Sequence, residues 1–190
     1  MLCMGGAVGL VTRRDMVCLM AGAATAAMVG PASAQSGGEL SAFSTATQML
    51  EALRAKRISA VELFDLHVER IRRFNPKLNA IVVETFARGR REAAAADRRI
   101  AAGERAPLLG LPITLKESEQ AAGLPQTAGI EPLREYRPDS DGRIAASVAR
   151  AGAALLGKTN VPVALGDWQA NNPIYGRTNN PWDLTRTPGG

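Results

Sequence analysis

The feature that most constrains this fold is the alternation of amphipathic helical segments with short apolar runs. The runs at 78–84 (LNAIVVE), 107–118 (PLLGLPITLKES) and 153–158 (AALLGK) favour strands, since they are short, apolar and bounded by Gly, Pro or polar residues. Helical patterns over about 85–102 and 142–151 separate them. Strands alternating with helices predict an α/β layered fold.

Two further helices are expected before the first strand. The segment TATQ has capping-box spacing and predicts a helix from Thr45 to about Arg57. The same spacing recurs at Ser59, where a second helix should begin. Its apolar residues recur at spacings of three and four and predict one buried face: Val61, Phe64, Val68 and Ile71. The pair Asn75–Pro76 is expected to stop this helix.

The later helices carry weaker signals. Gly103 is expected to end the helix over about 85–102. The acidic stretch Asp139–Asp141 is expected to cap the helix over about 142–151. His67 falls near the middle of the second helix, where a packing or polar role is expected rather than catalysis.

The first 34 residues have the pattern of an export leader. Arg13 and Arg14 precede an uncharged apolar stretch, Met16–Gly30, and Ala32–Ala34 forms a small-x-small cleavage site before Gln35. We therefore expect a bacterial protein that is exported, periplasmic or secreted. The paired arginines favour the twin-arginine route, with an ordinary Sec leader as the alternative. The stretch is short for a bilayer span, so no stable membrane span is expected after cleavage.

Loss of this leader would restrict the available chemistry. Cys3 and Cys18 would leave with residues 1–34, and His67 is the only histidine of the chain. The mature chain would then have no disulfide, no cysteine metal site and no histidine-based triad or zinc cluster. No metal and no organic cofactor are predicted.

The basic excess does not indicate nucleic-acid binding. The mature chain would keep a net charge of about +4. Arginines cluster in 69–77 (ERIRRFNPK) and 87–100 (ARGRREAAAADRRI), but acids are interleaved at helical spacing, which is typical of a solvated helix face. Aromatic residues that could stack on bases are scarce, so no nucleic-acid partner is expected.

The stretch GAALLGKT, Gly152–Thr159, matches the phosphate-binding loop pattern G-x-x-x-x-G-K-[ST]. That loop needs a strand before its first glycine and a helix that opens at the lysine. Here a helical segment precedes Gly152, the intervening residues are apolar, and Pro162 follows closely. The context therefore argues against a nucleotide site.

Three separated segments together resemble the amidase signature family of hydrolases. They are GLPITLKES (110–118), AGAALLGKTNVP (151–162) and DWQANNPIYGRTNNPWDLTRTPGG (167–190), and the resemblance covers roughly residues 40–190. It implies the α/β fold of that family, a mixed sheet core flanked by helices, of which this chain would be the N-terminal part. It also implies hydrolysis of the C–N bond of a small-molecule carboxamide without a cofactor.

In that family the lysine of the GxPxxxK segment is catalytic, and it corresponds to Lys116. The resemblance implies a Ser–Ser–Lys triad in which the lysine acts as a base. A base must be neutral, so we expect burial at the strand end to lower the pKa of Lys116. The alternative role for Lys116 is that of an exposed lysine at a strand end whose stem packs on apolar surface.

The serines of the triad are expected beyond the end of this sequence. Gly189 and Gly190 match the glycines that border the relay serine in the family. Residues 1–190 alone are therefore predicted to be inactive. Ser118, Ser140 and Ser147 are not assigned catalysis, although Ser118 is expected on the same strand face as Lys116.

Periodicity is weak after residue 160, where Asn, Gly and Pro are dense. Asn171, Asn172 and Tyr175 lie in this polar segment and are expected to hold the loop together rather than to line a pocket. Two alternatives to an exported amidase stay open: a non-catalytic amidase fragment that is inactive or binds a partner, and an amidotransferase subunit for tRNA-linked substrates. The amide substrate and the oligomeric state are left open.

Overall fold

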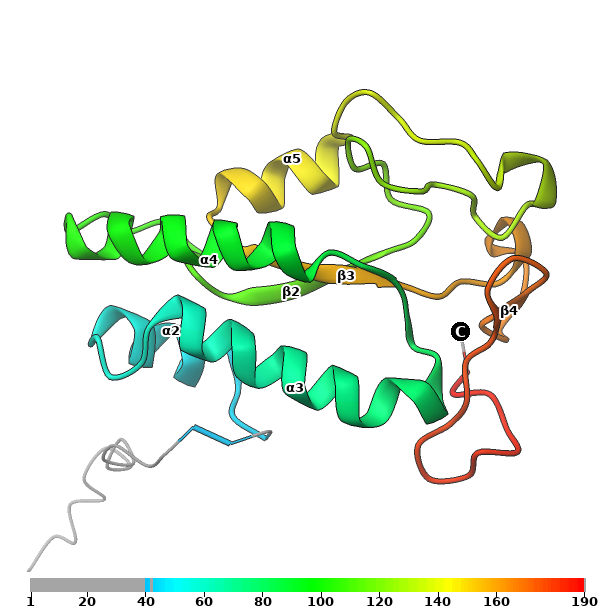
Figure 1. Ribbon diagram of the computed structural model, residues 1–190, viewed down its shortest axis with the longest axis horizontal. Coiled ribbons are helices and arrows are strands. Elements are labelled where there is room, and N and C mark those ends of the chain that lie inside the picture. The colour runs from blue at the N-terminus through cyan, green and yellow to red at the C-terminus, as the bar shows by residue number, and fades with distance from the viewer. Residues whose placement is uncertain (1–39, 42, 190) are drawn as a thin grey trace, which may run out of the picture. The chain divides into compact units, whose positions relative to one another are not determined.

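The computed structural model describes residues 40–41 and 43–189. The predicted leader, with Cys3 and Cys18, lies outside the described residues. In chain order the main elements are α2 (Ala46–Arg54), α3 (Ala60–Leu78), β1 (Ile81–Glu84), α4 (Phe86–Ala101), β2 (Pro112–Lys116), α5 (Arg143–Arg150) and β3 (Ala154–Thr159), shown in Figure 1. Short elements complete the chain: the 3-10 turns Glu131–Leu133 and Val163–Leu165, and the two-residue strands β4 (Asn171–Asn172) and β5 (Gly176–Arg177).

The main sheet is mixed and has β3 in its centre. β1 pairs with β3 in antiparallel orientation, and β2 pairs with β3 in parallel orientation. A parallel pair needs a long crossover, and α5 lies in the connection between β2 and β3. The predicted α/β fold with its three strands is confirmed.

Helices pack on both faces of this sheet. Successive residues of a strand point to opposite faces, and β3 follows this rule. Ala154 and Leu156 belong to a core cluster formed with α2, α3 and α4, whereas Leu155 packs with Leu115 and Ala145 of α5 in a second cluster. The predicted apolar face of α3 lies in the first cluster, where Phe64 is fully buried.

Two glycines allow the elements around β3 to approach closely. A Cβ atom on Gly89 of α4 would overlap the carbonyl oxygen of Leu155. A Cβ atom on Gly157 of β3 would lie 2.5 Å from the carbonyl oxygen of Val83 in β1, far below van der Waals contact. Packing therefore restricts both positions to glycine.

The starts of α2 and α3 follow the sequence prediction, but the ends of both helices do not. Thr45 and Ser59 form the predicted capping boxes. However, α2 ends at Arg54 rather than near Arg57, and α3 continues past Pro76 to Leu78.

The predicted stop at Asn75–Pro76 is wrong because proline in the last turn removes only one N–H group. The end of α3 is fixed instead by Asn79, which adopts the left-handed conformation (φ 52°) and donates its N–H to the Asn75 carbonyl at 2.7 Å. The Asn75 side chain then accepts the N–H groups of Ala80 and Ile81 at 2.8 and 2.9 Å.

The predicted cap of α5 is also wrong. The residue before this helix is Gly142, and no side chain caps the helix. Asp141 instead accepts the N–H of Ala122 at 2.7 Å, and Ser140 accepts hydrogen bonds from the Gln120 side chain. The acidic stretch therefore holds the loop that follows β2. None of the helices formed by residues 40–41 and 43–189 has the length and apolarity that a bilayer span requires.

Candidate active site

Lys116 is the last residue of β2 and is paired in register with Thr159 of β3. The strand end is held by the N–H of Glu117, which donates to the Thr159 carbonyl at 2.9 Å. Contrary to the expectation from sequence, the Lys116 side chain is exposed in the described part of the chain. The reason is that Thr114 and Lys116 share one face of an edge strand, and both are exposed, whereas Leu115 between them is buried.

The buried lysine of this region is Lys158, on the central strand. Its side chain is 0% exposed, and its Nζ donates a hydrogen bond to the Pro125 carbonyl oxygen. Burial lowers the pKa of Lys158 to about 8, while the negative charges of Glu117 and Glu119 act in the opposite direction. Lys158 therefore has the environment that the sequence predicted for Lys116.

Glu117 is a second charged residue that is fully buried beside this strand end. Its carboxylate accepts the N–H groups of Thr127 at 2.7 Å and Ala128 at 2.8 Å, and Tyr175 donates its hydroxyl to the same carboxylate at 3.0 Å. Burial, together with the negative charge of Glu117, raises the pKa of Tyr175 to about 12. The hydroxyl is thus kept as a donor.

These contacts form a buried polar network around Glu117, the residue that follows Lys116, and we define it as Glu117, Lys158, Thr127 and Tyr175. It connects the ends of β2 and β3 to the loop around residues 125–128 and to the C-terminal polar segment. Buried charges are tolerated when they are hydrogen-bonded, and no buried side-chain nitrogen or oxygen of the described chain lacks a partner. The network therefore fixes the backbone that presents Lys116.

Sequence reasoning did not identify Glu117 and Lys158 as members of a network. For Lys158 the sequence did contain a signal. This lysine ends the apolar run AALLGK, which forms the central strand. A side chain there is covered from both sides, so a charge needs internal partners.

The polar segment after β3 is held together as predicted. Asn172 is buried, and its side-chain amide donates to Asn160 and to the Val161 carbonyl, both at 2.8 Å. Its oxygen accepts the N–H groups of residues 174 and 175. Asn171 is exposed and pairs with Arg177 in the β4–β5 hairpin.

None of Ser118, Ser140 and Ser147 is hydrogen-bonded to Lys116 within residues 43–189. Ser118 lies in a turn after β2, so its expected place on the strand face is wrong. Its carbonyl accepts the Gln126 side chain at 3.0 Å. Ser147 is exposed on α5 and accepts from Arg150, and Ser140 contacts Gln120.

The stretch Gly152–Thr159 has the wrong geometry for a phosphate-binding loop, in agreement with the sequence argument. Helix α5 precedes it, β3 occupies its centre, and Lys158 is turned into the interior. His67 is half-buried on α3, with its Nδ1 2.8 Å from the Leu63 carbonyl oxygen. The described residues contain no group of three or more His, Cys, Asp or Glu side chains that could hold a metal ion.

Comparison with known proteins gives a consistent result. The family model described as Amidase matches residues 62–190. An indoleacetamide hydrolase of Bradyrhizobium diazoefficiens is 38% identical over 147 residues, which are 77% of this chain and 28% of that protein. A glutamyl-tRNA(Gln) amidotransferase chain of Halorhodospira halophila is 36% identical over 146 residues, 77% of this chain and 30% of the relative.

Solved structures agree with this result. A bacterial aryl acylamidase of the amidase signature family superposes with a TM-score of 0.73 at 31% identity, over 77% of this chain and 31% of the other. A 6-aminohexanoate cyclic dimer hydrolase superposes with a TM-score of 0.68 at 31% identity, over 77% and 30% of the two chains. The chain thus spans about three tenths of the length of the relatives that it matches.

Proposed function

Because the chain belongs to the amidase signature family, we propose that it contributes the lysine of a site that hydrolyses the C–N bond of a carboxamide. The products are a carboxylic acid and ammonia or an amine. The observation that supports this proposal best is the position of Lys116. It ends a strand inside the matched residues, on the uncovered face of that strand, with its backbone held by the buried polar network.

In the proposed reaction Lys116 acts as the base of a Ser–Ser–Lys triad. The neutral amine of Lys116 accepts a proton from a relay serine. The relay serine accepts a proton from the hydroxyl of a second serine, whose oxygen attacks the amide carbonyl carbon. An acyl–serine ester forms, the C–N bond breaks, and the proton passes to the leaving nitrogen. Water then attacks the ester and releases the acid.

This mechanism sets a requirement on Lys116. An amine acts as a base only when it is neutral, and burial is the usual way to favour the neutral form. The face that carries Thr114 and Lys116 is exposed in the described chain. The proposal therefore requires that the polypeptide that carries the two serines covers this face in the active protein.

Ammonia release from a simple amide tests the proposal. With indole-3-acetamide as the probe, we expect no turnover from residues 1–190 alone. Sequencing of the coding DNA past the codon for Gly190 establishes whether Ser-Ser-Gly-Gly follows, and any longer product that carries these serines is then assayed. Lys116→Ala in that product should lower kcat/KM by roughly 10³-fold or more, as loss of a catalytic base does.

The matched control is Lys77→Ala, another exposed lysine, on α3. It should leave kcat/KM unchanged, and both variants should keep the melting temperature of the parent. Turnover by residues 1–190 alone, or an active Lys116→Ala variant of the longer product, would contradict the proposal.

We also propose that the protein is exported, which separates it from the second candidate function, that of an amidotransferase component. That candidate is favoured by the identity to the glutamyl-tRNA(Gln) amidotransferase chain of Halorhodospira halophila. N-terminal sequencing of protein from fractionated cells decides between them. A periplasmic or secreted chain that begins at Gln35 supports the exported amidase, whereas a cytoplasmic chain that retains residues 1–34 supports the amidotransferase component.

A further inference from the structure

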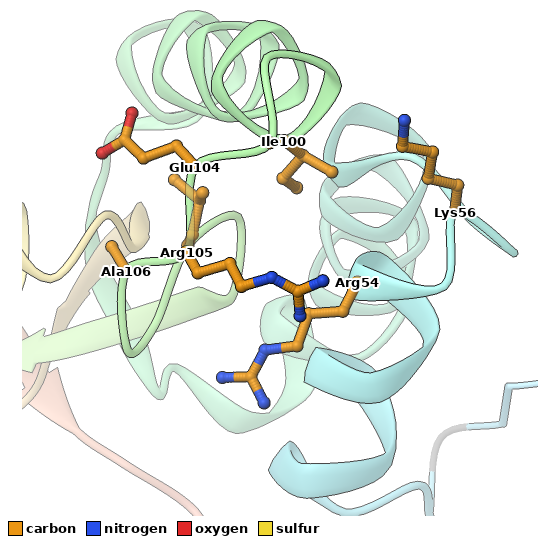
Figure 2. A pocket seen from close by; sticks show the side chains of 8 residues that line it. Arg54, Lys56, Ile100, Glu104, Arg105 and Ala106 are labelled. Atoms are coloured by element: carbon orange, nitrogen blue, oxygen red, sulfur yellow. The ribbon is translucent and has the colours of Figure 1, made fainter.

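We propose that a pocket between the end of α2 and the loop before β2 binds the phosphate group of a small phosphate monoester, held by the guanidinium groups of Arg54 and Arg105. Arg54 is the last residue of α2, and Arg105 lies in the loop between α4 and β2. Figure 2 shows the Arg105 side chain extended across the pocket toward that of Arg54. This proposal is independent of amide hydrolysis.

The pocket has room for such a ligand and an apolar base on which a substituent could pack. Its volume is about 170 Å³, well above the roughly 10–15 Å³ that a cavity needs to hold one water. Ile100, Ala106 and Leu109 contribute apolar surface, and Leu109 is buried in the main core. A phosphate with a small hydrocarbon group matches this combination of charge and apolar surface.

The charge of the pocket is not balanced by the residues that line it. Arg54, Lys56 and Arg105 form no ion pair with any residue among 43–189, although all three line the pocket. The one acidic lining residue, Glu104, is held by Arg99 through two hydrogen bonds of 2.8 and 2.5 Å. In Figure 2 the Glu104 carboxylate points away from both guanidinium groups.

This arrangement fits phosphate better than a single negative charge. Each guanidinium presents a planar fork of N–H donors that matches the oxygens of a phosphate, and two forks can engage a dianion at once. Two arginines directed into one pocket also repel each other unless an anion lies between them. Lys56 adds positive charge from the opposite side, where its ammonium group points away from the arginines.

The test is a titration of the whole chain with phenyl phosphate at low ionic strength, followed by NMR of the arginine Nε–H signals. We expect saturable shifts of the Arg54 and Arg105 signals with phenyl phosphate, a higher apparent Kd for phenyl phosphate when inorganic phosphate is present, and no saturable shift with phenol. Shifts that do not saturate by about 10 mM phenyl phosphate would overturn the proposal. Such binding would have a free energy weaker than about 3 kcal/mol. A failure of inorganic phosphate to compete would also overturn the proposal.

Two double variants that each remove two positive charges distinguish binding in this pocket from general attraction by the net charge of the protein. The double variant Arg54→Gln/Arg105→Gln should raise the Kd by about tenfold or more, because charge-assisted hydrogen bonds to both guanidinium groups are lost. The control, Arg91→Gln/Arg143→Gln, removes two exposed arginines outside the pocket. It should change the Kd by less than about twofold.

Equal weakening by the two double variants would overturn the proposal, since it would show attraction by net charge alone. Circular dichroism establishes that each variant is folded. If the double variant does not fold, Arg105→Gln alone, in the exposed loop, serves in its place. It should raise the Kd by about threefold or more through loss of one fork, and an unchanged Kd would contradict the proposal.

Discussion

At the scale of single residues, two lysines at neighbouring strand ends have opposite environments. Lys116 and Lys158 both end apolar runs, and their strands pair directly. β3 lies between two strands and is covered on both faces, so Lys158 is buried. β2 is an edge strand, and the face that carries Lys116 is open. The position of a strand in the sheet therefore decides which of the two lysines is buried.

The lowered pKa of Lys158 predicts a pH dependence of stability. Its pKa is about 8 in the folded chain, whereas the ordinary pKa of a lysine is 10.5, so between these pH values the unfolded chain binds more protons. The free energy of unfolding should therefore rise with pH from about 8 to about 10.5, by up to about 3–4 kcal/mol from this residue. Urea unfolding at several pH values measures the rise.

Lys158→Met is the matched variant, because it keeps an unbranched side chain and removes the titrating group. The pH-dependent rise should be smaller in this variant than in the wild type. An identical pH profile of both proteins would show that Lys158 titrates normally in the folded chain.

Glu117 should be the most sensitive residue of the buried polar network. Glu117→Gln keeps the shape but places an NH₂ group against backbone N–H donors, so we expect a loss of about 2–3 kcal/mol in the free energy of unfolding. Tyr175→Phe removes a single hydrogen bond to this carboxylate and should lose about 1 kcal/mol. Guanidinium unfolding at pH 7 compares them, and an equal loss in both variants would contradict the central role of Glu117.

At the scale of elements, local signals predicted the helix starts better than the helix ends. The capping boxes at Thr45 and Ser59 involve residues three apart, so the sequence contains all of their parts. The end of α3 depends on Asn79 and on hydrogen bonds made by Asn75 after the last turn. These contacts outweigh the helix-stopping tendency of Pro76, and no local pattern shows them.

A contact between helices gives the next prediction. The Asp97 carboxylate of α4 accepts the first two N–H groups of α3, those of Ala60 at 2.6 Å and Val61 at 3.2 Å. Asp97→Ala should therefore lower the free energy of unfolding by about 1–2 kcal/mol, as loss of a helix N-cap does.

The control is Asp65→Ala, which removes an exposed ion pair with Arg90 on the same pair of helices. It should change the free energy of unfolding by about 0.5 kcal/mol or less. Denaturant unfolding of both variants at one pH gives the comparison. A loss for Asp65→Ala as large as that for Asp97→Ala would show that charge, rather than the cap, stabilises α3.

The contact between α4 and β3 depends on a missing side chain. A Cβ atom at residue 89 would overlap the Leu155 carbonyl and the Phe64 ring, which lies 2.5 Å away. Gly89→Ala should destabilise the protein by about 1–3 kcal/mol through overpacking, despite the better helix propensity of alanine. Ala94→Gly, at a half-buried position of the same helix, should lose at most about 1 kcal/mol. A stabilising Gly89→Ala substitution would contradict the close packing.

At the scale of the whole molecule, the strands and the position of Lys116 could be predicted from the sequence, whereas the network behind it could not. Apolar runs and their order are local properties, and they indicated all three strands of the main sheet. Glu117 meets Tyr175 across 58 residues, and Lys158 meets Pro125 across 33. Such contacts depend on how the loops return to the sheet, and no spacing rule encodes them.

The last prediction concerns another connection between segments that are far apart in the sequence. Asn79, after α3, donates its side-chain amide to the carbonyls of Tyr175 at 2.7 Å and Arg177 at 3.2 Å, and it adopts φ 52°. Asn79→Gly loses these hydrogen bonds but keeps access to the left-handed conformation. Asn79→Ala loses both features and should be less stable than Asn79→Gly by about 1 kcal/mol.

Hydrogen exchange separates the two contributions of Asn79. In both variants the amides of residues 171–178 should exchange faster, because the polar segment loses its two hydrogen bonds from the Asn79 side chain, while amides in the centre of α3 keep their protection. The difference in global stability between Asn79→Ala and Asn79→Gly then reports the backbone conformation alone. Unchanged exchange in residues 171–178 would mean that the segment is held without the Asn79 side chain, by Asn160 and by Thr178, which donates to the main-chain carbonyl of Asn79.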